Sequence, residues 1–184
     1  MKLINTILIG LFLTISTFAA DTKNWHVYFS PKGGCTEAVV DALNHSKSTV
    51  LVQAYSFTSK PIAEALINAA KRGVKIQAIL DKSQRTEKYT EATFLLHAGI
   101  PTYIDAKHAI AHNKVIVIDA HVVITGSFNF TKAAESENAE NLLVINDAEL
   151  AAKYAKNWAE HLQHSEAYEA PTKPYIETKQ RRRN

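Results

Sequence analysis

Residues 112–129 (HNKVIVIDAHVVITGSFN) bring together side chains that could act on a phosphodiester. His112 and Lys114 stand two positions apart, a spacing that puts an imidazole and an ammonium on one face of an extended strand. Neutral imidazole is a nucleophile near neutral pH, because its pKa is about 6.5. The ammonium, with the hydroxyl of Ser127 and the carboxamide of Asn129, would hold the anionic oxygens. The segment therefore predicts nucleophilic attack on phosphorus.

The elements that must position these residues follow from the apolar pattern of the chain. Runs of alternating, β-branched or aromatic residues predict strands at 25–29, 49–57, 74–80, 100–104, 115–118, 122–125 and 140–145. Apolar residues at helical spacing predict helices at 36–46, 60–72, 86–98 and 147–164. Because strands alternate with helices, we expect an α/β fold: an α/β/α sandwich around a mixed β-sheet.

The length of 184 residues suits one domain, which we place at residues 20–164. Before it, Lys2 and the apolar stretch 3–13 lead to small residues around Ala19, a pattern typical of a secretory signal. We expect this segment, 1–19, to be removed after Ala19, which makes the protein periplasmic or secreted. If it were retained, it would anchor the protein in a membrane. Residues 165–184 are predicted to be a flexible basic tail.

Composition narrows the classes of protein that the chain can represent. Cys35 is the single cysteine, so an intrachain disulfide and a cysteine-rich zinc site are excluded. The formal net charge is +3, but Lys2 and the tail residues Arg181, Arg182 and Arg183 supply more than this excess. The predicted domain is therefore close to neutral, and its charge alone does not indicate a nucleic-acid partner. The arginines could contact nucleic acid or anionic lipid, although a solvated tail is the favoured interpretation.

The chemistry-bearing residues follow the pattern His-x-Lys-(x4)-Asp-(x6)-Gly-Ser-x-Asn without a departure. Its positions are filled by His112, Lys114, Asp119, Gly126, Ser127 and Asn129. Several fixed residues at fixed spacing make a specific signal. The pattern resembles the HKD motif of the phospholipase D superfamily. Over residues 25–162 the chain is similar to the small bacterial endonucleases of that superfamily, with further likeness at 28–31, 54–58 and 126–135.

The resemblance implies a role for each matched residue. His112 would attack phosphorus to form a phosphohistidine, and Lys114 would hold the non-bridging oxygens. Ser127 and Asn129 would add hydrogen bonds to the same oxygens. Glu140 stands where the small nucleases carry an acidic residue that orients an active-site histidine, within its own chain or across to a partner.

A single copy of the motif implies that the active site is shared. A leaving alkoxide needs a proton from a second histidine, and the chain has no second His-x-Lys-(x4)-Asp. We therefore expect a homodimer in which two copies of His112 face each other across a two-fold axis. Asp119, at a strand end, is expected to hold a turn through hydrogen bonds. Gly126 is likewise assigned to structural support of the site.

Rival interpretations of these residues are weaker. Ser127 lies in Thr-Gly-Ser-Phe-Asn and lacks the Gly-x-Ser-x-Gly elbow of a serine hydrolase. Both Tyr55 and Phe57 are expected in the core.

Pairs of histidines raise the possibility of a metal site. His108 and His112 could be ligands, and His161 and His164 are one helical turn apart, but no carboxylate cluster accompanies either pair. We expect His161 and His164 on a solvated helix face. No metal site and no cofactor is therefore predicted.

These observations predict an exported, metal-independent endonuclease that cleaves DNA, with RNA as a further candidate substrate. The alternative is a phospholipase D-type hydrolase acting on a lipid phosphodiester, since the same residues would serve either substrate. The short chain leaves little room for an acyl-chain groove, which favours the nuclease. A binding protein with a decayed site is disfavoured because all six motif positions are intact. Membrane association would come from an uncleaved signal or from the basic tail.

Overall fold

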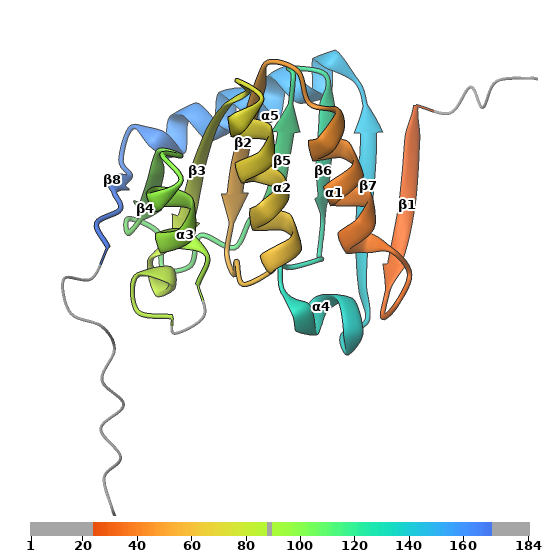
Figure 1. Ribbon diagram of the computed structural model, residues 1–184, viewed down its shortest axis with the longest axis horizontal. Helices are drawn as coiled ribbons and strands as arrows, with labels where there is room; N and C mark the ends of the chain where they lie inside the picture. Colours follow the sequence, from red (N-terminus) through yellow and green to blue (C-terminus); the bar gives the residue numbers. More distant parts are fainter. Residues whose placement is uncertain (1–23, 88–89, 171–184) are drawn as a thin grey trace, which may run out of the picture.

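A mixed β-sheet forms the centre of the protein, and helices cover both of its faces (Figure 1). The structure, a computed structural model, describes residues 24–87 and 90–170. The predicted signal peptide and the arginines at 181–183 lie outside the described residues. Within the described residues, eight strands form the sheet in the order β1-β7-β6-β5-β2-β3-β4-β8. The strands are β1 Trp25–Ser30, β2 Thr49–Ala54, β3 Lys75–Asp81, β4 Thr102–Asp105, β5 Lys114–Ile118, β6 Val122–Gly126, β7 Glu140–Asn146 and β8 Glu166–Ala167.

The helices divide between the two faces of the sheet. On one face lie α1 (Cys35–His45), α2 (Lys60–Lys71) and α3 (Ala92–His97), and on the other lies α5 (Ala148–Leu162), as Figure 1 shows. The short helix α4 (Lys132–Ser136) connects β6 to β7 and lies beyond the ends of these strands. Strands β2, β3 and β4 are parallel, whereas the other pairings are antiparallel. The predicted α/β/α sandwich around a mixed sheet is confirmed.

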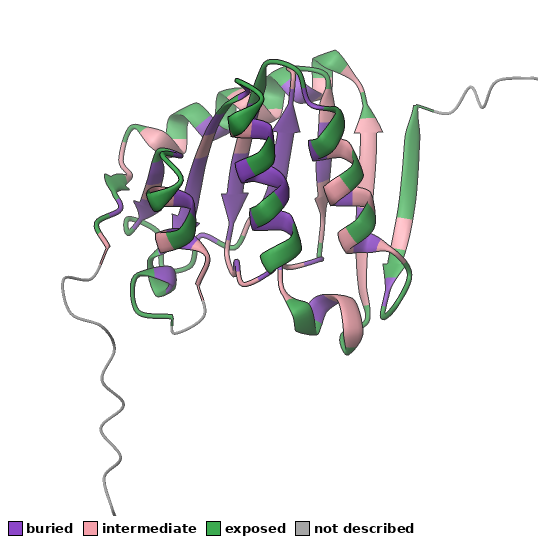
Figure 2. Ribbon diagram, viewed as in Figure 1, coloured by how far each residue is buried: buried purple, intermediate pink, exposed green. Residues whose placement is uncertain are grey.

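Successive side chains of β5 point into two different hydrophobic cores, one on each face of the sheet. Ile116 and Ile118 face the larger core under α1 and α2, whereas Val115 and Val117 face the smaller core under α5. The whole strand is therefore buried, and the central strands are the most deeply buried part of the sheet in Figure 2. The indole Nε1–H of Trp158 in α5 donates a hydrogen bond of 2.8 Å to the carbonyl of Val52, which fixes that helix on the sheet.

Because of the directions in which the strands run, several of them end or begin on the same side of the sheet. Parallel strands β2, β3 and β4 end there at Ala54, Asp81 and Asp105, and the antiparallel strands β5 and β7 begin there at Lys114 and Glu140. The register pairs Ala54 with Lys114 and Asp81 with Asp105. We call this rim of strand ends the site edge.

The predicted helix at 86–98 is shorter in the structure. A 3₁₀ turn, η1 (Lys82–Arg85), follows β3, and its start is capped by Asp81, whose carboxylate accepts a 2.9 Å bond from the Ser83 N–H. The Thr90 hydroxyl then accepts a 3.2 Å bond from the N–H of Ala92, where α3 begins. The predicted strand at 49–57 also ends early, at Ala54.

The folded domain reaches beyond the predicted boundary at residue 164. Strand β8 pairs with β4, and Tyr168 is buried with its hydroxyl 2.8 Å from that of Thr93. The first residues assigned to the tail therefore belong to the domain. Among the helices of the described residues, none is long and apolar enough to cross a membrane.

Candidate active site

Lys114 is the first residue of β5 and carries its charge at the site edge. Its side chain is buried, and its Nζ donates a 2.9 Å hydrogen bond to the carbonyl of His112. It shares a strand face with Ile116 and Ile118. Burial lowers the pKa of Lys114, and the nearby Glu140 carboxylate partly opposes that shift. A poorly solvated ammonium interacts strongly with an anion that reaches it.

His112 presents its ring at the surface beside Tyr55. The two ring centroids are 4.6 Å apart with an angle of 55° between the planes, and the Tyr55 ring centroid lies 5.0 Å from Nζ of Lys114. The expectation that Tyr55 belongs to the core was wrong, because its side chain is only partly buried and faces the motif. Phe57 is fully buried, as expected, and packs edge-on against Phe130. Tyr55 directly follows Ala54, the register partner of Lys114, so the pairing of β2 with β5 brings it to the motif.

Ser127 lies just after β6 and is held by a neighbouring strand. Its Oγ accepts hydrogen bonds from the backbone N–H and the side-chain amide of Asn141, at 3.0 and 3.3 Å. With the lone pairs of the oxygen engaged, the hydroxyl proton remains to be donated. In the described part of the chain, the buried Oδ1 of Asn129 has no hydrogen-bond partner. Unsatisfied buried polar atoms are rare in folded proteins and call for an explanation.

Gly126 allows the close approach of β6 and β7 that produces this arrangement. Its φ angle is +150°, and a Cβ atom placed there would lie 2.2 Å from the carbonyl oxygen of Asn141. A side chain would therefore push the two strands apart beside Ser127.

Glu140 is the first residue of β7 and lies opposite Ser30 in the register. Its N–H donates to the Ser30 hydroxyl at 3.2 Å, and its Oε1 accepts from the Asn138 amide at 3.3 Å. Its negative charge acts to raise the pKa of Lys114, against the effect of burial. The hydrogen bonds described for Glu140 do not include one to His112 of the same chain.

Asp119 lies at the opposite end of β5 from Lys114. Its carboxylate accepts hydrogen bonds from the N–H groups of Lys47, Ser48 and Thr49 and from the Ser48 hydroxyl, at 2.7–2.9 Å. Burial acts to raise the pKa of Asp119, but these hydrogen bonds outweigh it and hold the pKa below its usual value. The residue therefore ties the start of β2 to the β5–β6 turn and makes no contribution at the site edge.

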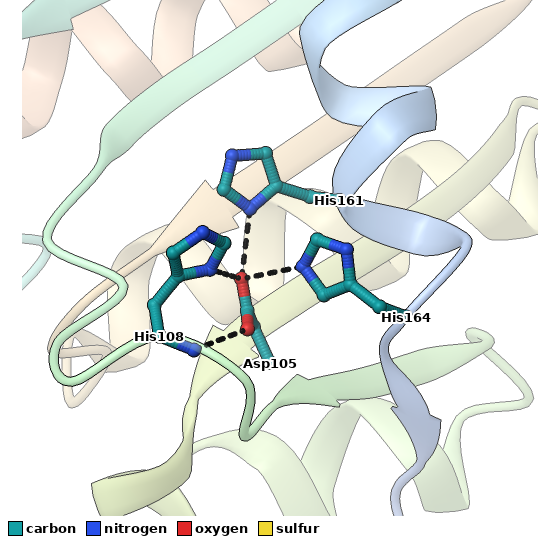
Figure 3. A group of neighbouring side chains, drawn as sticks. All are labelled: Asp105, His108, His161 and His164. Carbon is teal, nitrogen blue, oxygen red and sulfur yellow. Dashed lines mark hydrogen bonds and ion pairs between the residues drawn. The ribbon is translucent and has the colours of Figure 1, made fainter.

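A second group of polar side chains surrounds Asp105 (Figure 3). Oδ2 of this fully buried carboxylate lies 2.8 Å from Nδ1 of His108, 2.8 Å from Nδ1 of His161 and 3.3 Å from Nε2 of His164. The expectation of a solvated face for His161 and His164 was wrong, because their side chains are 15% and 22% exposed. Burial acts to raise the pKa of Asp105, but the three imidazoles hold it well below its usual range. The carboxylate that the sequence failed to supply comes from a different element, β4.

Comparison with known proteins gives relatives along most of the chain. The family model described as the PLD-like domain of cardiolipin synthase matches residues 39–162. A protein named phospholipase D from Rickettsia typhi is 45% identical over 136 residues, which cover 74% of this chain and 67% of that protein. A mitochondrial cardiolipin hydrolase from Chlamydomonas reinhardtii is 26% identical over 136 residues, covering 74% of this chain and 61% of its own length. The chain thus spans about two thirds of the length of the curated relatives it matches.

A solved structure matches at the level of the whole fold. The crystal structure of Nuc from Salmonella typhimurium, described as a phospholipase D family member, superposes with a TM-score of 0.76 and 37% sequence identity. The match covers 79% of this chain and 98% of that chain.

Proposed function

Since the chain belongs to the phospholipase D superfamily of phosphodiester hydrolases, we propose that it is an exported endonuclease that cleaves DNA, with RNA as a further substrate, and uses no metal ion in the reaction. One observation carries the proposal: an exposed imidazole at His112 and a buried ammonium at Lys114 lie together at one strand end. This pair supplies a nucleophile and a fixed positive charge, which are what an anionic phosphodiester requires.

The first step of the proposed reaction is attack by His112. A neutral ring nitrogen bonds to phosphorus, the bond from phosphorus to the leaving oxygen breaks, and a protonated histidine gives that oxygen its proton. Lys114 stabilises the charge on the non-bridging oxygens, with the free hydroxyl proton of Ser127 as a further donor. The same second histidine then takes a proton from water, whose oxygen attacks the phosphohistidine and releases the product.

The second histidine is the reason for proposing a homodimer. The described hydrogen bonds place no other histidine on Lys114 or Ser127, so the acid would be His112 of a second copy. Glu140 is proposed to orient one of the two imidazoles, with the partner's as the favoured recipient, because its described bonds leave its own chain's His112 untouched.

An apolar face on β1 offers a surface for the second copy. Val27 and Phe29 are 39% and 63% exposed, and Trp25 on the same strand face is also exposed. Their neighbours His26 and Tyr28 point to the other face, where they line a cavity with α1. The patch reaches Phe29, next to Ser30, which pairs with Glu140 at the site edge. A partner seated on this patch would therefore adjoin the active site.

A lipid phosphodiester is the second candidate substrate. The Rickettsia relative is named a phospholipase D, and the exposed side chains of Ile110 and Phe29 lie near the site edge, where they could enter a membrane surface. The chemistry at phosphorus would be the same. What separates the candidates is the group on either side of the phosphate.

Plasmid cleavage in excess EDTA is the test of the nuclease. Tag-free protein should nick and then degrade plasmid DNA, and His112→Ala should lose this activity by more than about a thousandfold, as expected for loss of a nucleophile. His97→Ala, which changes an exposed histidine at the end of α3, should match the wild type. Clean wild-type protein that cleaves neither DNA nor RNA would refute the proposal. Formation of phosphatidic acid from cardiolipin vesicles at a comparable rate would establish the lipid activity instead.

Sedimentation, with activity measured alongside, tests the dimer. Phe29→Asp should shift the protein from dimer to monomer and lower activity in parallel, since a charge in an apolar interface is costly. A monomer that keeps full activity at the assay concentration would refute the shared site. The export proposal predicts that expressed protein accumulates outside the cytoplasm with a mass lacking residues 1–19.

A further inference from the structure

Four side chains from three parts of the fold converge on one point, and we call them the Asp105 cluster (Figure 3). Asp105 ends strand β4, and His108 lies in the loop between β4 and β5. His161 lies in the last turn of α5, and His164 follows that helix. Neither the hydrogen bonds nor the ring contacts described for these four residues involve His112 or Lys114.

Hydrogen bonding alone accounts poorly for this geometry. Three imidazole nitrogens lie 2.8, 2.8 and 3.3 Å from the same oxygen, Oδ2 of Asp105. A carboxylate oxygen offers about two lone-pair directions, so a third N–H donor has no acceptor site of its own. The other oxygen, Oδ1, already accepts from the backbone N–H groups of Lys107 and His108. The ion-pair partners described for this fully buried carboxylate are the same three histidines.

A metal ion uses the same atoms without that conflict. Each histidine would contribute a lone pair rather than a proton, and the four ligand atoms all lie within 4.8 Å of one another. Tetrahedral Zn²⁺, with bonds of about 2.0–2.1 Å, sets its ligand atoms about 3.3 Å apart, close to the oxygen–nitrogen distances here. Three imidazoles and one carboxylate suit Zn²⁺, whereas Mg²⁺ and Ca²⁺ prefer oxygen ligands.

We propose that the Asp105 cluster binds one Zn²⁺ ion through Oδ2 of Asp105, Nδ1 of His108, Nδ1 of His161 and Nε2 of His164. Four protein ligands fill a tetrahedral shell and leave no position for substrate, so the ion is structural. The proposal goes beyond the nuclease, whose reaction at phosphorus uses no metal. It replaces the sequence-based prediction that the chain carries no metal site.

The position of the cluster gives the ion a specific task. It would fasten the β4–β5 loop, through His108, to the end of α5, and this loop leads within four residues to His112. The loop is also held by hydrogen bonds, among them those from Lys82 Nζ to the His108 carbonyl at 3.1 Å and from the Ala111 N–H to Asp81 at 2.7 Å. Loop residues such as Ile110 are exposed and add little packing. The ion would therefore limit the motion of the segment that positions the nucleophile.

Direct metal binding tests the proposal. Protein whose affinity tag has been cleaved is stripped with EDTA, freed of chelator and titrated with ZnCl₂ by calorimetry, with elemental analysis of the dialysed product. We expect one Zn²⁺ per chain, a higher thermal unfolding temperature with Zn²⁺ than without, and the visible absorption of tetrahedral Co²⁺ after substitution. His108→Ala, which changes an exposed loop residue and should fold, is expected to weaken Zn²⁺ binding at least about tenfold.

His97→Ala serves as the matched control, since it removes a histidine from the end of another helix. The proposal is overturned if stripped wild-type protein takes up no Zn²⁺, or if His108→Ala and His97→Ala bind it equally. Binding is also independent of the proposed nuclease: His112→Ala should bind Zn²⁺ like the wild type while failing to cleave DNA. Stripped wild-type protein should still cleave DNA below its lowered unfolding temperature.

Discussion

The ring of Tyr55 lies against the imidazole of His112, with centroids 4.6 Å apart and an angle of 55° between the planes. The same tyrosine ring lies 5.0 Å from the ammonium of Lys114. One aromatic side chain at the end of β2 is thus in contact with both groups to which we assign the chemistry. Such a contact limits the orientations open to an exposed imidazole.

Removing the Tyr55 ring should therefore lower activity without unfolding the protein. We expect Tyr55→Ala to reduce kcat about 2- to 13-fold, corresponding to an aromatic contact of about 0.5–1.5 kcal/mol. Tyr55→Phe keeps the ring and should stay within about twofold of the wild type. Steady-state plasmid or oligonucleotide cleavage measures both variants. Equal activity of Tyr55→Ala and Tyr55→Phe would show that the contact has no role.

Glu140 should set the alkaline limit of activity through Lys114. Burial lowers the pKa of Lys114 and the Glu140 carboxylate raises it, so Glu140→Gln should lower that pKa further. Because the proposed mechanism requires the protonated ammonium, the alkaline limb of the pH profile of kcat/KM should move to lower pH. Glu137→Gln, an exposed neighbour, is the control and should leave the profile unchanged. A Glu140→Gln profile with an unmoved alkaline limb would contradict the assignment.

A side chain at Gly126 should disrupt the site edge. Gly126→Ala places a Cβ atom 2.2 Å from the Asn141 carbonyl oxygen, at a backbone φ of +150°. We expect a loss of about 1–3 kcal/mol in the free energy of unfolding, measured in urea, because β6 and β7 must separate. Activity should fall further than stability explains, since Ser127 would move with the strand. Gly73→Ala, whose Cβ meets nothing within 4 Å, tests the φ effect alone.

Asp119 should matter for stability and not for the reaction. Asp119→Asn weakens four hydrogen bonds to residues 47–49, which should cost about 1–3 kcal/mol of unfolding free energy at pH 7. The folded-state pKa of Asp119 is lowered, so its contribution is present above the unfolded pKa of about 3.9 and lost as pH falls through the folded value. The difference from the wild type should therefore shrink on acidification. Asp41→Asn, with an exposed carboxylate, should show a much smaller difference.

The sequence predicted the parts of the fold that depend on local pattern. Alternation in 115–118 and 122–125 located β5 and β6, and helical spacing in 147–164 located α5. Strand β8 was not predicted, because it has only two residues and is defined by its pairing with β4. The helix predicted at 86–98 was too long: a 3₁₀ turn ends at Arg85, and α3 begins only at Ala92, whose N–H bonds to the Thr90 hydroxyl.

The motif positions were evident from sequence because their spacing is short and fixed. Tyr55 was not, because its contact with His112 arises when β2 pairs with β5. The Asp105 cluster was hidden for the same reason on a larger scale: His161 and His164 are 56 and 59 positions from Asp105. Proximity of this kind depends on how α5 packs against β4, which no local pattern encodes.

The site edge has a consequence for how such a protein can diversify. The residues to which we assign the chemistry lie at strand ends and in loops at the site edge. Asp119 lies at the opposite ends of the strands, where it binds the backbone of residues 47–49. Loops at the site edge could therefore be exchanged or lengthened while the buried strands beneath keep their packing. Substrate preference could then change without loss of stability, provided that a β4–β5 or β2–α2 loop grafted from a relative keeps His108, His112 and Tyr55.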